Sequence, residues 1–439
     1  MNYEQCLVYL DQIQNLGIKF GLDNVQTILS ALNNPQNHYP SVHVAGTNGK
    51  GSVCAMLSFI LMEHGLRPGL FTSPHLVTVR ERIQIAGEPI SKEDFSRLLT
   101  VLRDVIEELI ASQVLLAPPT YFEMLSCLAF LYFAEVQTDI AILEVGMGGR
   151  FDATNVVVPV VAAITTISPE HQKFLGETPS EIASEKAGII KPGVPLVCGV
   201  EEKDAYKTIK NKAKEQNAPF HPVFAKDKDL KKTKTGRNFR FVYRSGREEY
   251  AFAPSMLGEH QGKNGAIAIA VAHRLSKDWR PLERSRIIRG IDAAYWPGRL
   301  EVVSDRPLVL VDGAHNEEGA KALKAYVQEF ISLPCVLVFA VMRDKDIAKL
   351  SEILFPLADK VICTRFPYFK AASPEDIQKQ ASRFEGRIVV EPDVEKAVRA
   401  ALQAAKSEGT VLVAGSLFLV GEIKRIFAGH ADISQSVLS

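Results

Sequence analysis

A short segment near the start of the chain combines three glycines with a lysine, at residues 43–52 (HVAGTNGKGS). The apolar residues that lead into it are typical of a strand end, and residues 53–62 have the apolar density of a helix. Glycines in the turn between them allow positive φ angles, so that several backbone N–H groups can converge on one anion at the positive end of the helix. The sequence therefore predicts a phosphate-binding loop.

Side chains of the same loop add to this chemistry. Lys50 can reach the terminal phosphates of a nucleotide, and the hydroxyl of Thr47 or Ser52 can face a Mg²⁺ ion. The spacing differs from the common GxxxxGK[ST] form, because Val44 stands in place of the first glycine and Gly51 separates the lysine from Ser52. A glycine-rich turn with a solvated lysine is the alternative. The other loop residues expected to contact a nucleotide are Asn48, Gly49 and Gly51.

Three further side chains follow predicted strands or helices and are candidates for metal chemistry. Glu144 ends an otherwise apolar strand, where Mg²⁺ would neutralise its charge; a carboxylate held by backbone N–H groups is the alternative. His171 follows the next strand and is a candidate second ligand, with a surface histidine as the alternative. Lys186 lies on a helix soon after, and its surroundings in the sequence are those of a solvated lysine.

Composition limits the classes of partner. Lys plus Arg equals Asp plus Glu, at 51 each, so no global field favours nucleic acid or an acidic membrane surface. Six cysteines lie scattered in apolar runs without paired spacing, as is typical of buried free thiols in a reducing compartment. The first residues lack the basic start and apolar core of a signal peptide, and no apolar run is long enough to span a bilayer. We expect a cytoplasmic protein with no nucleic-acid or membrane partner.

The chain must position these residues with alternating strands and helices. Two helices are expected before residue 40, with breaks at Gly17 and Pro35. The alternation of strands and helices that follows predicts a parallel sheet whose loops meet at its carboxyl edge. The expected strands are residues 69–72, 139–145, a strand ending near Ser168, and 194–199; the expected helices include 91–112, one that starts at Thr120, and 178–189.

Two segments interrupt this pattern. Residues 226–234 are rich in lysine and are expected to form a solvated loop, and residues 239–252 alternate about a turn at 245–246, which predicts a hairpin. Residues 295–299 (YWPGR) break the helical pattern and mark the expected domain junction. We therefore predict domains at residues 1–296 and 297–439. The second is a smaller parallel α/β domain, with strands at 308–311, 336–341, 360–363, 388–390 and 410–414.

Further motifs occur in order along the chain: SPHL, ERI, TYFE, LEVGMGGRFDATN, EKAGIIKPG, HQGKN, PGRLE and DGAHN. Together with GTNGKGS they resemble the folate branch of the Mur ligase superfamily, the dihydrofolate synthase and folylpolyglutamate synthase family. The resemblance spans most of the chain. It implies an α/β fold in which a P-loop-type parallel-sheet nucleotide-binding domain with a small β element precedes a Rossmann-like α/β domain. The site would lie in the cleft between them.

The resemblance also implies roles for particular residues. Ser73, Glu144 and His171 resemble the Mg²⁺ ligands, with two ions implied, and Lys186 resembles a carbamylated lysine. Glu170 departs from the family, which usually has Asp before the metal-binding His. The residues that resemble nucleotide contacts are Asn264, Arg299 and Asp312, with His315 and Ser416 near the cleft.

The implied pterin site comprises Thr120, Tyr121, Phe122, Glu123, Phe151, Asp152 and Ala153. A flat pterin ring favours stacking on an aromatic side chain such as Phe122. Core packing is the alternative for Tyr121 and Phe122.

The implied reaction activates a carboxylate with ATP to give an acyl phosphate, which the amine of L-glutamate attacks to form an amide. Dihydropteroate, a reduced folate, or both would be the acceptor. The expected catalytic residues are Lys50, Lys186, Arg299 and His315, the last as a hypothetical base. A monomer is expected, with K⁺ as a possible additional cation. The alternatives are a Mur-type cell-wall precursor ligase, a P-loop phosphotransferase or nucleotide switch, and a silent nucleotide-binding module.

Overall fold

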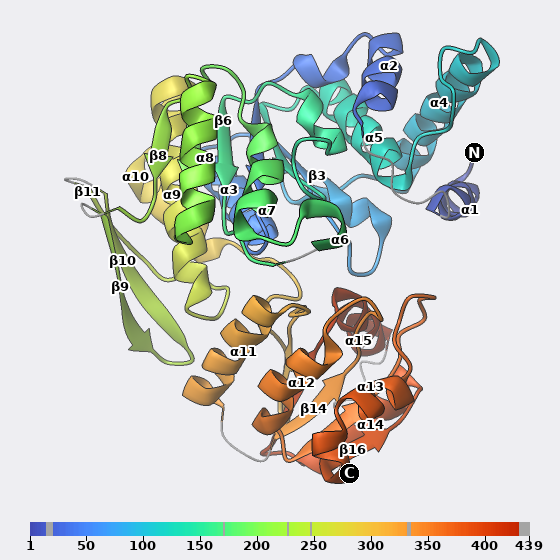
Figure 1. The fold of residues 1–439 in the computed structure, drawn as a ribbon, viewed down its shortest axis with the longest axis vertical. Coiled ribbons are helices and arrows are strands. Elements are labelled where there is room, and N and C mark those ends of the chain that lie inside the picture. Colours follow the sequence, from blue (N-terminus) through green and yellow to red (C-terminus); the bar gives the residue numbers. More distant parts are fainter. Residues whose placement is uncertain (15–20, 170–171, 226–227, 246–247, 332–334, 430–439) are drawn as a thin grey trace.

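The computed structural model describes residues 1–14, 21–169, 172–225, 228–245, 248–331 and 335–429. Within them the chain forms an eight-stranded sheet, a separate three-stranded sheet and a six-stranded sheet. Figure 1 shows the larger part, which contains the eight-stranded sheet, above a smaller part built on the six-stranded sheet. The two-domain α/β architecture expected from the sequence is thereby confirmed, while the boundary at residues 296 and 297 stays a prediction.

The eight-stranded sheet has the order β4-β3-β2-β5-β1-β6-β7-β8. Its strands are parallel except that β3 runs antiparallel to both β2 and β4. The predicted strand near Ser168 in fact ends at Ile164, four residues earlier. The strands are β1 Ser41–Ala45, β2 Pro68–Phe71, β3 Ile83–Ile85, β4 Glu88–Pro89, β5 Ile140–Glu144, β6 Val161–Ile164, β7 Leu196–Cys198 and β8 Phe220–Pro222.

Helices cover this sheet on both faces, because the central strands are apolar on both sides. Local signals start several of them: Ser91 accepts a hydrogen bond from Asp94 N, and Thr120 forms a capping box with Glu123. The helices are α1 Tyr3–Gln14, α2 Asp23–Ala31, α3 Lys50–Glu63, α4 Lys92–Ala111, α5 Tyr121–Glu135, α6 Gln172–Leu175, α7 Pro179–Lys186, α8 Lys203–Glu215, α9 His260–Asp278 and α10 Arg284–Ala293.

The lysine-rich segment corrects one expectation. Strands β10 Asn238–Ser245 and β11 Glu248–Phe252 pair antiparallel, as predicted, but the expected solvated loop is strand β9 Lys228–Thr235, paired with β10. Its lysines fit a strand because their charged ends lie over aromatic rings and reach carboxylates. Lys232 Nζ lies 5.2 Å from the ring centroid of Phe239, and Lys234 Nζ lies 4.7 Å from that of Phe330.

The six-stranded sheet has the order β12-β13-β17-β14-β15-β16 and is parallel except for the edge strand β12, which the sequence did not reveal. Its strands are β12 Glu301–Asp305, β13 Leu308–Val311, β14 Cys335–Phe339, β15 Lys360–Cys363, β16 Ile388–Val390 and β17 Thr410–Ala414. One apolar cluster packs α11 to α13 on one face and another packs α14 and α15 on the other. These helices are α11 Glu317–Phe330, α12 Ile347–Leu354, α13 Pro374–Gln380, α14 Val394–Ala405 and α15 Leu417–Gly429.

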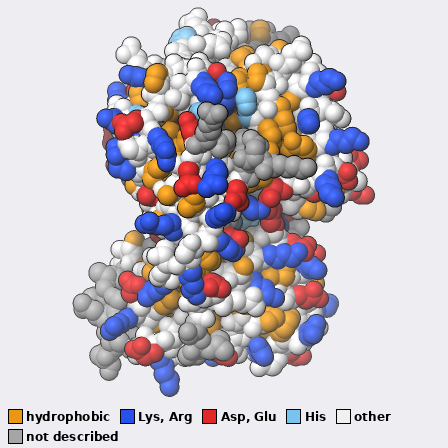
Figure 2. Space-filling model, turned by 90° about the vertical axis from the view of Figure 1, so that its left-hand side faces the viewer, with side chains coloured by type: hydrophobic (Ala, Val, Ile, Leu, Met, Phe, Trp, Pro, Cys, Tyr) orange, Lys and Arg blue, Asp and Glu red, His pale blue; other side chains and the backbone are white. Residues whose placement is uncertain are grey.

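The two domains touch away from the junction as well as at it. Leu76, in the loop after β2, packs into the cluster beside α15, and Arg425 Nη2 donates a hydrogen bond to Val77 O at 2.7 Å. On another side, Phe239 of β10 packs edge-on against Phe330 of α11, with ring centroids 5.1 Å apart. Figure 2 shows a narrowing between the two parts, with positive and negative side chains intermixed on the face in view.

All six cysteines are buried and free. Among the residues that the structure describes, no helix is long and apolar enough to span a bilayer.

Candidate active site

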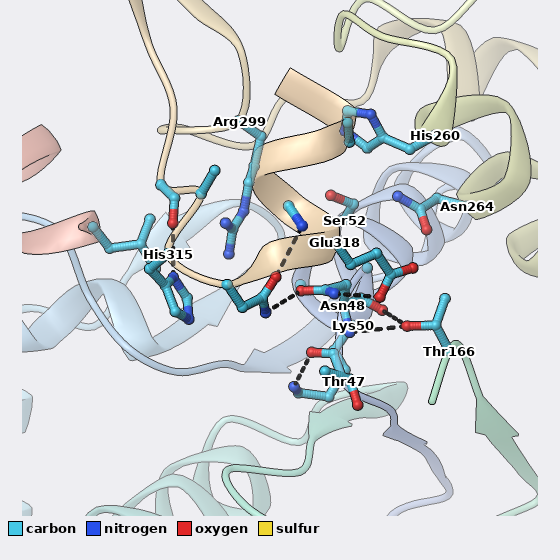
Figure 3. A pocket seen from close by; sticks show the side chains of 18 of the residues that line it. Thr47, Asn48, Lys50, Ser52, Thr166, His260, Asn264, Arg299, His315 and Glu318 are labelled. Atoms are coloured by element: carbon cyan, nitrogen blue, oxygen red, sulfur yellow. Dashed lines mark hydrogen bonds between the residues drawn. The ribbon is translucent and has the colours of Figure 1, made fainter. Parts of the chain in front are cut away.

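A cavity of about 250 Å³ lies between the carboxyl edge of the eight-stranded sheet and the start of α11. Residues from both domains and from the junction line it, and Figure 3 shows them facing one another. The cavity brings together many of the residues singled out from the sequence. These are Thr47, Asn48, Gly49, Lys50, Gly51, Ser52, Ser73, Glu144, Lys186, Asn264, Arg299, Asp312 and His315.

Backbone contacts shape the phosphate-binding loop between β1 and α3. Gly46 has φ 149°, and a Cβ there would lie 1.9 Å from Thr165 Oγ1, so only glycine fits. Thr47 N donates to Thr166 O at 2.8 Å, which ties the loop to the segment after β6. Helix α3 starts after Gly49 (φ 84°) with no side-chain cap, so its first N–H groups remain available where residues 49–52 line the cavity.

Two lysines converge on this loop. Lys50 Nζ donates to Gly46 O at 3.0 Å and to Thr47 O at 3.1 Å. Lys186 Nζ donates to the same Gly46 carbonyl at 2.9 Å and is only 3% exposed. Lys186 is therefore not the solvated lysine that its sequence context suggested, and two cationic side chains lie beside the loop that would receive phosphates.

Glu144 is buried at the end of β5 with its side chain in the cavity. Its Oε2 accepts a hydrogen bond from Ser73 N at 3.0 Å. One carboxylate oxygen is therefore held by a backbone N–H group, as in the alternative to a Mg²⁺ ligand that the sequence left open. Burial raises the pKa of Glu144, and the charge of Lys50 partly offsets that rise. In the described part of the chain no three His, Cys, Asp or Glu side chains cluster as a metal site, and His171 lies outside the described residues.

Helix α9 forms a third side of the cavity, and two glycines set its position. A Cβ at Gly262 would lie 2.3 Å from the ring of Phe241, and one at Gly265 would lie 2.5 Å from the ring of Phe252. The three-stranded sheet therefore packs directly on the helix backbone, which places Asn264 in the cavity.

The same helix contributes residues that the sequence analysis did not assign. Gln261 is fully buried; its Nε2 donates to Ser52 Oγ at 3.4 Å, and its Oε1 accepts from Asn264 Nδ2 at 2.9 Å. Burial lowers the pKa of His260, the residue before it, and so favours the neutral ring. The HQGKN segment contains His260 and Gln261, but within it the family resemblance implies a role for Asn264 alone. The other unassigned lining residues on this side are Thr166 and Lys263.

The smaller domain supplies the opposite wall through the loop between β13 and α11. Asp312 is buried, and its Oδ2 and Oδ1 accept hydrogen bonds from Leu300 N and Ala314 N, both at 2.8 Å. His315 Nδ1 lies 2.7 Å from Gly313 O, a contact in which Nδ1 carries the proton. In its neutral form the ring therefore carries its lone pair on Nε2.

Three residues join the two walls, and two of them were not foreseen. Asn48 Nδ2 donates to Glu318 Oε2 at 2.6 Å, and Asn316 Nδ2 donates to Asn48 Oδ1 at 3.0 Å (Figure 3). Asn316 also caps α11, because its Oδ1 accepts from Gly319 N at 2.8 Å. The phosphate loop thus touches the first turn of a helix from the other domain.

Comparison with known proteins places this geometry in a family. The model of the Mur ligase middle domain matches residues 44–272, and that of the Mur ligase glutamate ligase domain matches residues 298–417. A dihydrofolate synthase/folylpolyglutamate synthase of Bacillus subtilis is 34% identical over 427 residues, which cover 96% of this chain and 98% of the relative. The chain belongs to the dihydrofolate synthase/folylpolyglutamate synthase family of Mur ligases.

Solved structures of this family share the fold. A folylpolyglutamate synthase of Thermotoga maritima is 34% identical, with a TM-score of 0.84 over 97% of this chain and 96% of that one. Escherichia coli FolC, solved with DHPP and ADP, is 28% identical, with a TM-score of 0.87 over 97% of this chain and 98% of that one.

The segments that the family resemblance assigns to the pterin lie outside the cavity described above, directly behind one of its loops. Residues 146–148 line the cavity, and the ring of Phe122 lies 2.6 Å from where a Cβ of Gly146 would stand. Asp152 is buried and accepts a hydrogen bond from Met147 N at 2.9 Å. Both side chains therefore support the loop from its far side.

The remaining residues of that set have structural contacts of their own. Glu123 Oε2 accepts from Thr120 N at 2.7 Å in the capping box, and Tyr121 and Phe122 pack partly buried against the apolar core. The ring of Tyr121 also faces the guanidinium of Arg82 at 5.3 Å. Elsewhere, Phe151 is half-exposed, Ala153 is buried, and the buried Ser416 accepts a hydrogen bond from Phe418 N at 3.1 Å.

Proposed function

We propose that this protein is an ADP-forming ligase that activates the carboxylate of a pterin or folate with ATP and joins it to L-glutamate. One observation carries the proposal. A phosphate-binding loop and two lysines on one domain face Asp312 and His315 of another domain across a single cavity, in a chain of this family. Such an arrangement suits the transfer of a phosphoryl group followed by attack of an amine.

The larger domain would bind the triphosphate. The N–H groups at the start of α3 and the ammonium of Lys50 oppose the charge of the phosphoryl group as it moves to the acceptor carboxylate, and Arg299 adds a further positive charge. The product of this step is an acyl phosphate, with ADP as the leaving group. Asn264 and Asp312 are proposed nucleotide contacts.

Glu144 and Ser73 would hold Mg²⁺. The site fits a hard cation, because the buried carboxylate of Glu144 and the hydroxyl-bearing residue Ser73 both line the cavity that would receive phosphate oxygens. Bound Mg²⁺ would neutralise charge on the phosphoryl oxygens. Lys186 would serve as a ligand only as a carbamate, which forms when its neutral amine adds CO₂ and releases a proton. His171 and a second ion are proposed from the family resemblance alone.

Contact between the domains would protect the intermediate. An acyl phosphate is lost if water reaches it before the amine does. The loop residue Asn48 already meets α11 through two hydrogen bonds, so closure of this contact would separate the reacting groups from solvent. The amine of glutamate then attacks the acyl carbon, phosphate leaves, and His315 Nε2 is the proposed acceptor of the proton from nitrogen.

The acceptor is proposed to be dihydropteroate, a reduced folate, or both. Phosphate release by the purified protein with Mg-ATP and L-glutamate would be compared with dihydropteroate, with tetrahydrofolate and without acceptor. Phosphate release that requires both glutamate and one of the pterins supports the ligase function. The pterin that supports this release is then the substrate. Release that ignores both would overturn the proposal in favour of a nucleotide switch or phosphotransferase.

Four finer points also remain proposals. Free buried cysteines fit a reducing compartment, which supports the cytoplasm. A monomeric state is proposed and is tested by light scattering.

Stimulation of turnover by K⁺ over Na⁺ at equal ionic strength would test a role for that cation. Mass spectrometry of the native protein with bicarbonate tests the carbamate, since an unmodified Lys186 under turnover conditions contradicts it.

A further inference from the structure

Charge is divided unevenly across the cavity. Among the described lining residues the positive side chains all precede residue 300: Lys50, Lys186, Lys263 and Arg299. Beyond that point the described lining residues include Asp312 and Glu318 but no Lys or Arg. The phosphate-binding wall thus carries lysines beside Glu144, whereas beyond the junction residue Arg299 the charged side chains on the wall from the smaller domain are carboxylates, and we call this wall acidic.

The two carboxylates on the acidic wall differ in what they bind. Both oxygens of Asp312 accept backbone N–H groups, which hold the loop before α11 in shape. Glu318, in the first turn of α11, is exposed, and its Oε2 accepts one hydrogen bond from the neutral amide of Asn48 at 2.6 Å. Figure 3 shows Glu318 beside Asn48 in the cavity. Glu318 is thus the carboxylate of this wall with capacity left to bind a cationic ligand.

The proposed reaction brings a single organic cation into this cavity. ATP, the acceptor acid and the acyl phosphate are anions, whereas the incoming amino acid carries an α-ammonium group. We propose that the Glu318 carboxylate binds this α-ammonium group, a role that rests on the proposed ligase function. A charge-assisted hydrogen bond to an ammonium is stronger than one to a neutral donor.

The position of Glu318 suits this role. Asn48 belongs to the phosphate loop, so its hydrogen bond holds the carboxylate next to the place where the transferred phosphoryl group would lie. A nitrogen bound there would be within reach of the acyl carbon once the two domains are in contact. Glu318 accepts hydrogen bonds from the ammonium and forms no covalent bond. The proton that nitrogen must lose passes to a different acceptor.

The variant Glu318→Gln keeps the size of the side chain and removes its charge. We expect the KM for L-glutamate to rise about 10- to 100-fold, because a charged hydrogen bond becomes a neutral one, while the KM for ATP changes less than about 2-fold. Glutarate has both carboxylates of glutamate but no amine. As a competitive inhibitor it should bind the wild type and Glu318→Gln equally well.

Glu317→Gln is the matched control. Glu317 is the adjacent carboxylate on α11, pairs with Lys321 at 2.7 Å and does not line the cavity, so its loss should leave the KM for glutamate unchanged. Equal weakening of glutamate and glutarate by Glu318→Gln would overturn the proposal and leave Glu318 as a contact between domains. No effect on either would overturn it as well.

Calorimetry separates this inference from the ligase proposal. Glutamate and glutarate would be titrated into wild type and Glu318→Gln loaded with the ATP analogue AMPPCP. A wild type that binds glutamate but releases no phosphate contradicts the ligase function, and the titrations still decide the role of Glu318. If the wild type turns over normally and glutamate binds equally well to the wild type and to Glu318→Gln, the role of Glu318 is contradicted while the ligase function stands.

Discussion

The two walls of the cavity are built in different ways. The phosphate-binding wall is made largely of backbone, with glycines pressed against neighbouring groups: a Cβ at Gly46 would meet Thr165, and one at Gly51 would lie 2.7 Å from Trp296 Nε1. The opposite wall consists of the loop between β13 and α11 and the first turns of α11, and it meets the phosphate-binding loop through side-chain hydrogen bonds of Asn316 and Glu318 to Asn48.

This difference indicates which wall moves. Close-packed backbone cannot shift without steric cost, whereas a hydrogen bond between side chains contributes about 0.5–1.5 kcal/mol when both partners are neutral, as for Asn316, and about 1.5–3 kcal/mol when one is charged, as for Glu318. We therefore expect the hydrogen bonds at Asn48 to break before the packed backbone of the phosphate-binding loop deforms. Substrates would enter by separation at this contact, and a preformed phosphate-binding wall would receive ATP unchanged.

Loss of the cation on the preformed wall should have the largest effect. Lys50→Met removes the ammonium that lies over the loop carbonyls and would oppose the charge on the phosphoryl group. We expect glutamate-dependent phosphate release to fall about 10²- to 10³-fold with little change in stability. Steady-state kinetics measure the phosphate release, and thermal unfolding measures the stability. Lys212→Met, which removes a lysine paired with Glu215 outside the cavity, should retain full turnover.

Overfilling the same wall should reduce stability. Gly46→Ala adds a methyl group where the backbone has φ 149° and Thr165 Oγ1 is 1.9 Å away, so strain and collision should together lower the free energy of unfolding by about 3 kcal/mol or more. Gly65→Ala is the control, since Gly65 has φ 75° with nothing within 4 Å. It should cost about 1 kcal/mol. If urea unfolding shows equal losses in the free energy of unfolding for Gly46→Ala and Gly65→Ala, packing around Gly46 does not fix the shape of the loop.

The contrast between the walls also explains what the sequence could predict. Lys50 and Glu144 follow strand ends, and local patterns of glycine, charge and hydrophobicity identified them. Lys186, Asp312 and His315 were found through family motifs. Asp312 and His315 line the cavity because they follow strand β13 of the smaller domain, whereas Lys186 reaches it from the end of α7.

The residues that were missed depend on contacts distant in sequence. Glu318 and Asn316 reach the loop only because the two domains face each other, 270 and 268 residues from Asn48. Gln261 reaches Ser52 because aromatic rings press on glycines of α9. Strand β9 was missed because its lysines are typical of a solvated loop. Their charged ends are exposed, and only their position over the rings of Phe239 and Phe330 shows how they fit a strand.

A buried histidine behind the loop should make the stability of the preformed wall depend on pH. His43 is fully buried and its Nε2 lies 2.8 Å from Thr154 Oγ1; burial, and then the charge of Lys191, lowers its pKa to about 3. Unfolding restores a pKa near 6.5. The unfolded chain therefore binds the proton first, so stability is complete above pH 6.5 and is lost as pH falls.

Between about pH 7 and pH 5 this loss should amount to about 2 kcal/mol. It is measured as the difference in pH slope between the wild type and His43→Gln, which cannot titrate. His75, whose pKa burial also lowers to about 3, contributes equally to both proteins and cancels. Parallel slopes for the two proteins would mean that His43 can be protonated in the folded state, and the wall behind the loop would then be less rigid than its packing implies.

The smallest effect should come from the contact that supports the movable wall. Lys234 of β9 pairs with Glu329 of α11 at 2.8 Å, but both side chains are about half-exposed, with 51% and 47% exposure. Such pairs contribute about 0.2–1 kcal/mol, and Lys234→Met keeps the apolar stem over Phe330. We expect a loss below about 0.5 kcal/mol. Lys234→Asp should cost more, because it places a second carboxylate beside Glu329.

Turnover of Lys234→Met tests which contact governs closure. If the hydrogen bonds of Asn48 set the position of α11, the KM for glutamate should match the wild type, because those bonds lie at the other end of the helix. A large rise in that KM would mean instead that β9 holds the acidic wall in place. The three-stranded sheet, which packs on both α9 and α11, would then be the element that couples the two walls.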